Sequence, residues 1–210
     1  VIQQQNLQSQ YSKQILVRNY WDKKWGMKKI VLYMVLIFTA STLYADVNDN
    51  DGKVWLWEEH GVSLKFTQLT PLQSEAFFIG RGFSAENAAV VGSSCMFQGI
   101  FRNDGAKTVE YNLTEWKVIQ QQNLQSQYSK QILVRNYWDK KWDLLDIPDS
   151  PKIAFRWSLI PTQQQFEPED YNWGMISFGL QPSESFDLDV TLYLNGSKLQ
   201  TTILAMECAK

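Results

Sequence analysis

The strongest constraint on the fold is a strict alternation of apolar and polar residues near the C-terminus. In Phe186–Leu194 every second residue is large and apolar. A period of two is typical of a strand that buries one face. The run ends at Asn195-Gly196, a pair that accepts the positive φ angles of a type I′ hairpin turn. We therefore predict a β-hairpin whose second strand runs from Lys198 to Glu207.

A second hairpin is predicted upstream. Cys95–Phe101 alternates in the same way, Asn103–Gly105 contains a turn, and Thr108–Leu113 supplies the returning strand. Further short runs indicate strands at Val54–Glu58, Val62–Gln68, Lys152–Ile160 and Gly174–Leu180. About eight strands with few helices are typical of a sandwich. We expect a mainly β fold, a two-sheet immunoglobulin-like β-sandwich with one or two peripheral helices.

Two helix starts lie in the connections between predicted strands. Thr70 and Pro71 are the residue types preferred at an N-cap and at the first helical position, which predicts a helix that ends near Arg81. Ser84 is a second N-cap residue, and we expect a short helix from there through Ala89.

One segment occurs twice, because residues 1–25 and residues 118–142 are identical. Repeats that build a fold diverge and recur at a regular period, so we interpret residues 1–26 as a duplicated, non-native extension. The alternative is a self-peptide that competes with the internal copy for its docking site. In the internal copy, Gln120–Gln127 predicts a loop or a fraying helix start. The apolar spacing in Ser129–Leu145 predicts an amphipathic helix that crosses between the sheets.

Residues 27–45 have the parts of a signal peptide. Two lysines precede the unbroken apolar run Ile30–Ala40, and Leu43-Tyr44-Ala45 ends in a small residue. The alternative is an uncleaved anchor, but Ile30–Ala45 is shorter than the ~20 residues that span a bilayer. We expect a bacterial periplasmic or secreted protein without a stable membrane anchor, and one mature domain at residues 46–210.

Net charge narrows the range of partners. The formal charge of the whole chain is -2. Residues 1–45 hold six of the 20 Lys and Arg but only one of the 22 Asp and Glu, so residues 46–210 carry a formal charge of -7. An acidic domain without a basic stripe repels phosphate groups. We therefore expect neither nucleic acid nor an anionic membrane surface as a partner.

The two cysteines, Cys95 and Cys208, predict a disulfide, because an even number in an exported protein favours pairing. The bridge would close a loop of about 110 residues and stabilise the fold by about 4 to 5 kcal/mol in the chain-entropy model. The alternatives are two free buried thiols or a soft-metal site.

Two sets of side chains have the chemistry of metal ligands. Asp49, Asp51 and Glu58 match three positions of a calcium loop around Gly52, but Val47 stands where the first carboxylate ligand is required. The soft and imidazole ligands that copper prefers are present at His60, Met96, Met175 and Met206. These four share no short motif, and methionine in a strand is usually a core residue.

Catalytic fingerprints are missing from the sequence. The single histidine, His60, would have to serve any nucleophilic triad, yet its place before Gly61 between two predicted strands indicates a surface turn. We expect no cofactor.

Acidic and aromatic residues concentrate just before the strand predicted at Gly174–Leu180. They are Glu167, Glu169, Asp170, Tyr171 and Trp173. Tyr and Trp give large contact areas at a low entropic cost, so such loops are typical of partner-recognition surfaces. We expect a non-catalytic binding or accessory protein that presents this acidic-aromatic surface to another exported protein. The alternatives are a periplasmic protein that handles calcium or copper, and a hydrolase that uses His60 or the acidic loop.

Overall fold

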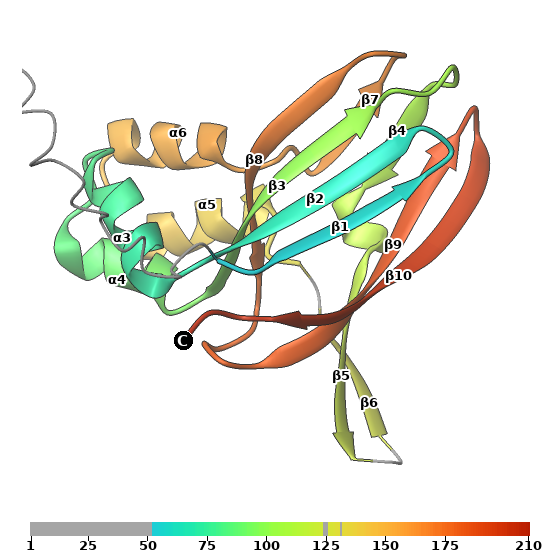
Figure 1. The fold of residues 1–210 in the computed structure, drawn as a ribbon. Coiled ribbons are helices and arrows are strands. Elements are labelled where there is room, and N and C mark those ends of the chain that lie inside the picture. Colours follow the sequence, from blue (N-terminus) through green and yellow to red (C-terminus); the bar gives the residue numbers. More distant parts are fainter. Residues whose placement is uncertain (1–51, 124–125, 131) are drawn as a thin grey trace, which may run out of the picture. The chain divides into compact units, whose positions relative to one another are not determined.

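The structure is a computed structural model that describes residues 52–123, 126–130 and 132–210. The first copy of the duplicated segment, the predicted signal peptide and the two aspartates of the predicted calcium loop, Asp49 and Asp51, lie outside the described residues. The described residues form ten strands and four α-helices, a mainly β fold as predicted (Figure 1).

One sheet, which we call sheet A, has four antiparallel strands in the order β1-β2-β3-β8. Successive side chains of each strand point to opposite faces of the sheet, and in Val62–Leu69 buried residues alternate with more exposed ones. Its strands are β1 (Val54–Glu59), β2 (Val62–Leu69), β3 (Cys95–Asn103) and β8 (Tyr171–Phe178).

The other sheet, sheet B, is built around strand β9, which pairs with three other strands. One edge of β9 pairs along its length with β10, and both β4 and β5 pair with β9 as well, at its two ends. The short 3-10 helix Leu113–Glu115 separates β4 from β5. The strands are β4 (Val109–Asn112), β5 (Lys117–Asn123), β6 (Ser126–Lys130), β7 (Gln163–Phe166), β9 (Ser185–Leu194) and β10 (Ser197–Glu207).

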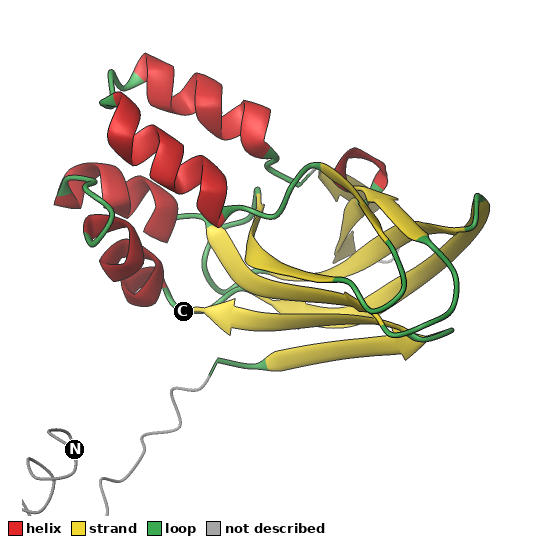
Figure 2. Ribbon diagram, turned by 90° about the horizontal axis from the view of Figure 1, so that it is seen from above, coloured by secondary structure: helices red, strands yellow, loops and turns green. Residues whose placement is uncertain are grey.

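Four α-helices gather at one end of the sheets, as the two ribbon views show (Figure 2). Thr70 caps the first of them in a capping box with Gln73, and Ser84 caps the second through the Asn87 backbone N–H, as the sequence predicts. The helices are α3 (Pro71–Ile79), α4 (Ala85–Gly92), α5 (Arg135–Leu144) and α6 (Asp149–Ser158).

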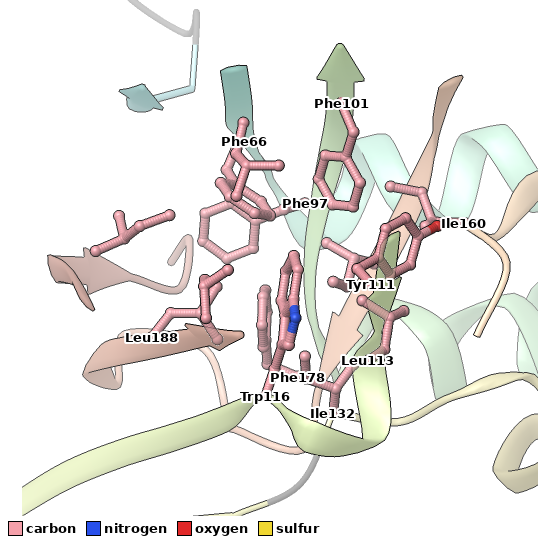
Figure 3. Packing of buried hydrophobic residues seen from close by; sticks show 14 of the residues in the cluster. Phe66, Phe97, Phe101, Tyr111, Leu113, Trp116, Ile132, Ile160, Phe178 and Leu188 are labelled. Carbon is pink, nitrogen blue, oxygen red and sulfur yellow. The ribbon is translucent and has the colours of Figure 1, made fainter. Parts of the chain in front are cut away.

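The larger hydrophobic core, the sheet core, contains inward-facing residues of both sheets. Trp116 is completely buried in it, and its indole N–H donates a hydrogen bond to the Thr191 carbonyl at 2.8 Å. Phe66, Phe101 and Tyr111 surround the indole, with ring centroids 5.6 to 6.5 Å from it (Figure 3). A buried tryptophan with its polar atom satisfied gives the sheet core one preferred packing.

A second hydrophobic core, the helix core, joins the helices to the outer face of sheet A. Met96 of β3 and Met175 of β8 point into it, together with Phe78, Trp142 and Phe155 of the helices. The prediction of one or two peripheral helices is therefore wrong in number. The four helices form a layer of their own because their apolar faces cover one end of sheet A.

Cys95 and Cys208 form the predicted disulfide, with Cα atoms 5.2 Å apart. Cys95 begins β3 of sheet A, and Cys208 directly follows β10 of sheet B. The bridge therefore ties the two sheets together next to the helix layer.

Lys152–Ile160 is not a strand as predicted, because most of it belongs to helix α6. Its apolar alternation is misleading, since Ile153 and Trp157 are exposed and Phe155 is buried. Asp149 and Pro151 in the first turn are the residues that favour a helix here.

The internal copy of the duplicated segment also differs from expectation. Gln120–Gln127 lies mostly in β5 and β6, and helix α5 begins at Arg135, six residues after the predicted start. The open edge of β9 explains the difference, because β5 supplies the hydrogen-bond partners that this edge needs and buries Val118 in the sheet core. None of the described helices is long and apolar enough to cross a membrane.

Candidate functional site

The acidic residues of the predicted recognition loop form the turn between β7 and β8. The Asp170 carboxylate accepts a hydrogen bond from the Glu167 backbone N–H at 3.0 Å. Glu167 in turn accepts from the Thr108 hydroxyl at 3.0 Å and from the Gln165 amide at 2.9 Å. Two of the three carboxylates therefore shape the turn. The third, Glu169, is exposed at a positive φ of 71°.

Asn103 holds this turn against the rest of the molecule. Its side chain is 1% exposed, and its amide donates to the carbonyls of Lys107 and Phe166 at 2.7 and 3.2 Å. The side-chain oxygen accepts from the Gly105 N–H at 3.2 Å. The Asn103 backbone exchanges two further hydrogen bonds with Asp170 and Glu169. One buried asparagine thus fixes where β8 starts and which way its first side chains point.

The turn between β1 and β2 packs against the same region. His60 and Gly61 have φ angles of 53° and 77°, so both occupy the left-handed region, as a two-residue hairpin turn requires. A Cβ atom on Gly61 would lie 2.6 Å from the Cα of Gly105, so only glycine permits this close approach. His60 lies in a surface turn, as predicted, beside the Glu59 carboxylate at 3.1 Å.

Tyr171 and Trp173 lie in strand β8, not in a loop before a strand as predicted. They alternate with inward-facing residues, and their side chains are 61% and 57% exposed on the outer face of sheet A. The strand register places Leu56, Lys65, Ile100 and Trp173 in one row across the four strands. Directly opposed side chains in a row lie about 5 Å apart and touch.

A neighbouring row aligns Glu58, Ser63, Arg102 and Tyr171, and the row on the other side of Trp173 begins with Val54. Arg102 lies over the Tyr171 ring, 5.6 Å from its centroid. We call the combined surface the aromatic face. It consists of Val54, Leu56, Lys65, Ile100, Arg102, Tyr171 and Trp173.

The aromatic face is unusual because large apolar side chains are exposed there together. Val54 and Leu56 are 52% and 57% exposed, whereas the alternate residues Trp55 and Trp57 are partly buried against the sheet core. Single exposed apolar residues are ordinary, whereas a contiguous group marks an interaction site. The helix layer covers only the part of this face around Met96 and Met175, so the aromatic face is the uncovered part.

The outer face of sheet B makes a useful comparison. Its register aligns Lys198, Tyr193, Glu110 and Gln165 in one row. The Tyr193 hydroxyl donates to the Glu115 carboxylate at 2.7 Å, which raises the pKa of that tyrosine. The two outer faces therefore differ: that of sheet B is polar, and that of sheet A is aromatic and aliphatic.

The aromatic face carries two positive side chains, Arg102 and Lys65, and the exposed Glu58 lies beside it in the row of Arg102. Arg102 bonds to Asp104 at 3.2 Å, and this hydrogen bond raises the pKa of the guanidinium. Lys65 lies between Leu56 and Ile100 and forms no ion pair with any described residue. A partner that covers this face would therefore meet apolar surface around one unpaired ammonium group.

The residues predicted as copper ligands are not gathered into one site. Met96 and Met175 belong to the helix core, Met206 belongs to the sheet core, and His60 is exposed in its turn. Glu58, the last ligand of the predicted calcium loop, lies in strand β1. Within the part of the chain that the structure describes, no three His, Cys, Asp or Glu side chains are arranged to hold a metal ion.

Sequence reasoning found Tyr171 and Trp173 but missed Val54, Leu56, Lys65, Ile100 and Arg102. These residues come from β1, β2 and β3, and only strand register brings them beside β8. Part of this surface could have been predicted from Val54–Glu58, which has large apolar residues on both faces of a strand. Only one face can pack on the sheet core, so the other face is a candidate contact surface. Comparison with known proteins found no matching family model, no matching curated protein and no matching solved structure.

Proposed function

We propose that this chain is a non-catalytic binding or accessory protein whose aromatic face contacts another exported protein. The observation that carries the proposal is one row across sheet A, in which the exposed Leu56 and Trp173 flank Lys65 and the partly exposed Ile100. Tyr, Trp and Arg are the residues enriched at protein interfaces and at their energetic centres.

The rigid support of the face favours the same proposal. Asn103 and the turn that it holds fix the start of β8. The disulfide joins the start of β3 to the residue that follows β10. A preorganised surface loses little entropy when it binds. The acidic residues contribute by shaping the β7–β8 turn, so Glu169 and the aromatic residues are what the turn presents to a partner.

Export to the periplasm or out of the cell belongs to the same proposal. It is supported by the charge and apolar pattern of residues 27–45 and by the disulfide, which persists in oxidising compartments. An immunoglobulin-like arrangement is a finer proposal, supported by the two facing antiparallel sheets.

Site-specific photo-cross-linking tests the binding proposal. A photoreactive phenylalanine analogue replaces Trp173 in one variant and Tyr193, on the polar face of sheet B, in a matched control. We expect one discrete protein adduct in the host's exported fraction from position 173 and none from position 193. Equal adducts from both positions, or none from position 173, would contradict the proposal.

The purified partner then allows a quantitative test. Trp173→Ala should weaken binding by at least about 10-fold if this residue lies at the centre of the interface. Trp157→Ala is the control, because Trp157 is 78% exposed but lies on helix α6. Matching losses of affinity in both variants would place the interface elsewhere.

A further inference from the structure

Sheet A has two edges, and the chain itself closes one of them. Along β8, the Ser177 carbonyl accepts a hydrogen bond from the Leu133 N–H at 2.8 Å. The Met175 carbonyl accepts one from the Ile160 N–H at 2.9 Å. The other edge is strand β1, beside which the described residues add no further strand to sheet A (Figure 1). The open edge of sheet A is therefore β1.

The backbone of β1 presents a regular row of unpaired groups at this edge. The Gln68 N–H donates to the Lys53 carbonyl at 2.9 Å, so Lys53 bonds toward β2. In an antiparallel ladder, residues that bond to the neighbouring strand alternate with residues whose N–H and C=O groups point away from it. The groups that point away from β2 are therefore those of Val54, Leu56 and Glu58. None of them forms a hydrogen bond with another described segment.

Strand β1 also lacks the features that usually keep edge strands from pairing. These features include proline, lysine and β-bulges. The sequence VWLWEE contains neither proline nor lysine, and all six residues pair with β2 without a bulge. The edge strand β10 differs, because its register shifts between Ile203 and Met206 and Ala205 has a positive φ of 54°. The edge of β1 is thus regular and largely apolar, which favours pairing with another strand.

Side-chain contacts with the end of β10 hold β1 in place. The Trp55 indole N–H donates to the Ala205 carbonyl at 3.1 Å, and Lys53 forms an ion pair with Glu207. Neither contact uses the free backbone groups of β1. An edge that is already fixed loses little entropy when a strand joins it.

Strand β1 is complementary to itself in the antiparallel register centred on Leu56. This register places Val54 opposite Glu58 of a second copy and Leu56 opposite its own equivalent, and each such pair exchanges two hydrogen bonds through the free groups. On the outer face, the two Leu56 side chains touch. On the inner face, Trp55 lies opposite Trp57 of the second copy, and both are only partly buried within one copy. Aromatic pairs across strands stabilise a sheet.

The charges match in the same register. Lys53 lies opposite Glu59 of the second copy, and Glu58 lies opposite the apolar Val54. A register that placed Glu58 opposite Glu58 would oppose like charges, which destabilises a sheet. The charges of β1 therefore favour the register that is centred on Leu56.

We propose that this chain forms a two-fold symmetric dimer in which β1 pairs with β1 of a second copy. The two four-stranded sheets then form one continuous antiparallel sheet. The two-fold axis is perpendicular to this sheet, so the two aromatic faces lie on the same side and their Leu56 rows join. Two linked faces give a partner with two binding sites an avidity that one face lacks. The dimer does not depend on the proposed function, because its test requires no partner.

Sedimentation equilibrium of the purified, oxidised protein tests the dimer. We expect a change from monomer to dimer between about 1 and 300 µM, the range for a small, non-obligate interface. Leu56→Lys opposes two ammonium groups across the axis and should raise the dissociation constant at least about 10-fold. Leu204→Lys is the matched control, because Leu204 is 65% exposed on β10 outside the interface.

A proline variant tests the backbone pairing itself. Leu56→Pro removes an N–H that points away from β2, so it leaves the β1–β2 hydrogen bonds intact and should abolish the dimer. Gln200→Pro is its control, because the Gln200 N–H points away from β9 at the edge of β10. Leu56→Lys decides the question if Leu56→Pro lowers the melting temperature more than Gln200→Pro does.

Disulfide trapping tests the register. The two native cysteines are paired, so an introduced cysteine is the only free thiol. Leu56→Cys places two thiols opposite each other, with Cα atoms about 5.5 Å apart, and should form a covalent dimer on mild oxidation. Glu58→Cys lies on the same face, but its two copies are offset by about 13 Å along the strand and should not cross-link.

Three results would overturn the proposal. The first is a monomer throughout the concentration range. The second is an equal effect of Leu56→Lys and Leu204→Lys on the dissociation constant. The third is equal cross-linking of Leu56→Cys and Glu58→Cys, which would show a contact other than the register centred on Leu56.

Discussion

Asn103 offers the sharpest test of how the candidate site is built. Asn103→Ala removes three side-chain hydrogen bonds. Gly105 and Lys107 lie near solvent, so water replaces the amide there, and each lost bond costs about 0.5 to 1 kcal/mol. Phe166 pairs with Val109 in the β4–β7 ladder, so its carbonyl retains a backbone partner and the loss of this third bond costs a similar amount.

Together these losses predict that Asn103→Ala destabilises the fold by about 1.5 to 3 kcal/mol, or about 3 to 12 °C in melting temperature for a domain of this size. Urea unfolding followed by tryptophan fluorescence measures the free energy directly. The same variant should weaken partner binding, because the β7–β8 turn loses its anchor. Asn136→Ala is the matched control, because Asn136 is exposed on α5, and its cost should stay within about 0.5 kcal/mol.

Asn103→Asp adds a pH dependence with a definite sign. The introduced carboxylate would be buried and would face two carbonyl oxygens, which raises its folded-state pKa above the unfolded value of about 3.9. Its stability should therefore be closest to wild type below pH 4 and fall as the pH rises through the folded-state pKa. A cost below about 0.5 kcal/mol for Asn103→Ala, or an Asn103→Asp variant that gains stability as the pH rises, would refute the reasoning.

Three further predictions concern stability. Replacing both Cys95 and Cys208 by alanine should destabilise the fold by about 4 to 5 kcal/mol, since the bridge spans 113 residues of sequence, and calorimetry with the reduced wild type as comparison measures this. Burial raises the pKa of Tyr111, whose hydroxyl donates to the Pro161 carbonyl at 3.1 Å. The stabilisation from the neutral phenol is therefore fully present below the unfolded pKa of about 10 and is lost at higher pH. Ultraviolet titration should show this phenol ionising only when the protein unfolds. If Tyr111→Phe left the titration curve unchanged, the assignment to Tyr111 would be wrong. A hydrogen bond from Lys53 lowers the pKa of Glu207, so the stabilisation from this pair should be present above the unfolded glutamate pKa and disappear as the pH falls through the folded value. Lys53→Met should therefore lower the melting temperature at pH 7 but not at pH 3, and an equal effect at both values would refute the ion pair.

Helix α6 and strand β5 show where local pattern was insufficient. In α6 the apolar residues alternate, but Ile153 and Trp157 are exposed and Phe155 alone anchors the middle of the helix in the helix core. In β5 the glutamines have no strong preference for a strand. The unfilled edge of β9 decides their conformation, because its backbone groups need partners.

Features that depend on adjacent residues or on a count could be predicted without the structure. Asn195-Gly196 adopts φ angles of 48° and 76° because both residues tolerate the left-handed region. Thr70 caps its helix through Gln73, three positions away. Two cysteines can form an intramolecular bridge in only one way. The aromatic face, in contrast, forms only when the chain folds. Leu56, Ile100 and Trp173 become neighbours only through the register of β1, β2, β3 and β8, and that register is set by which side chains the sheet core buries.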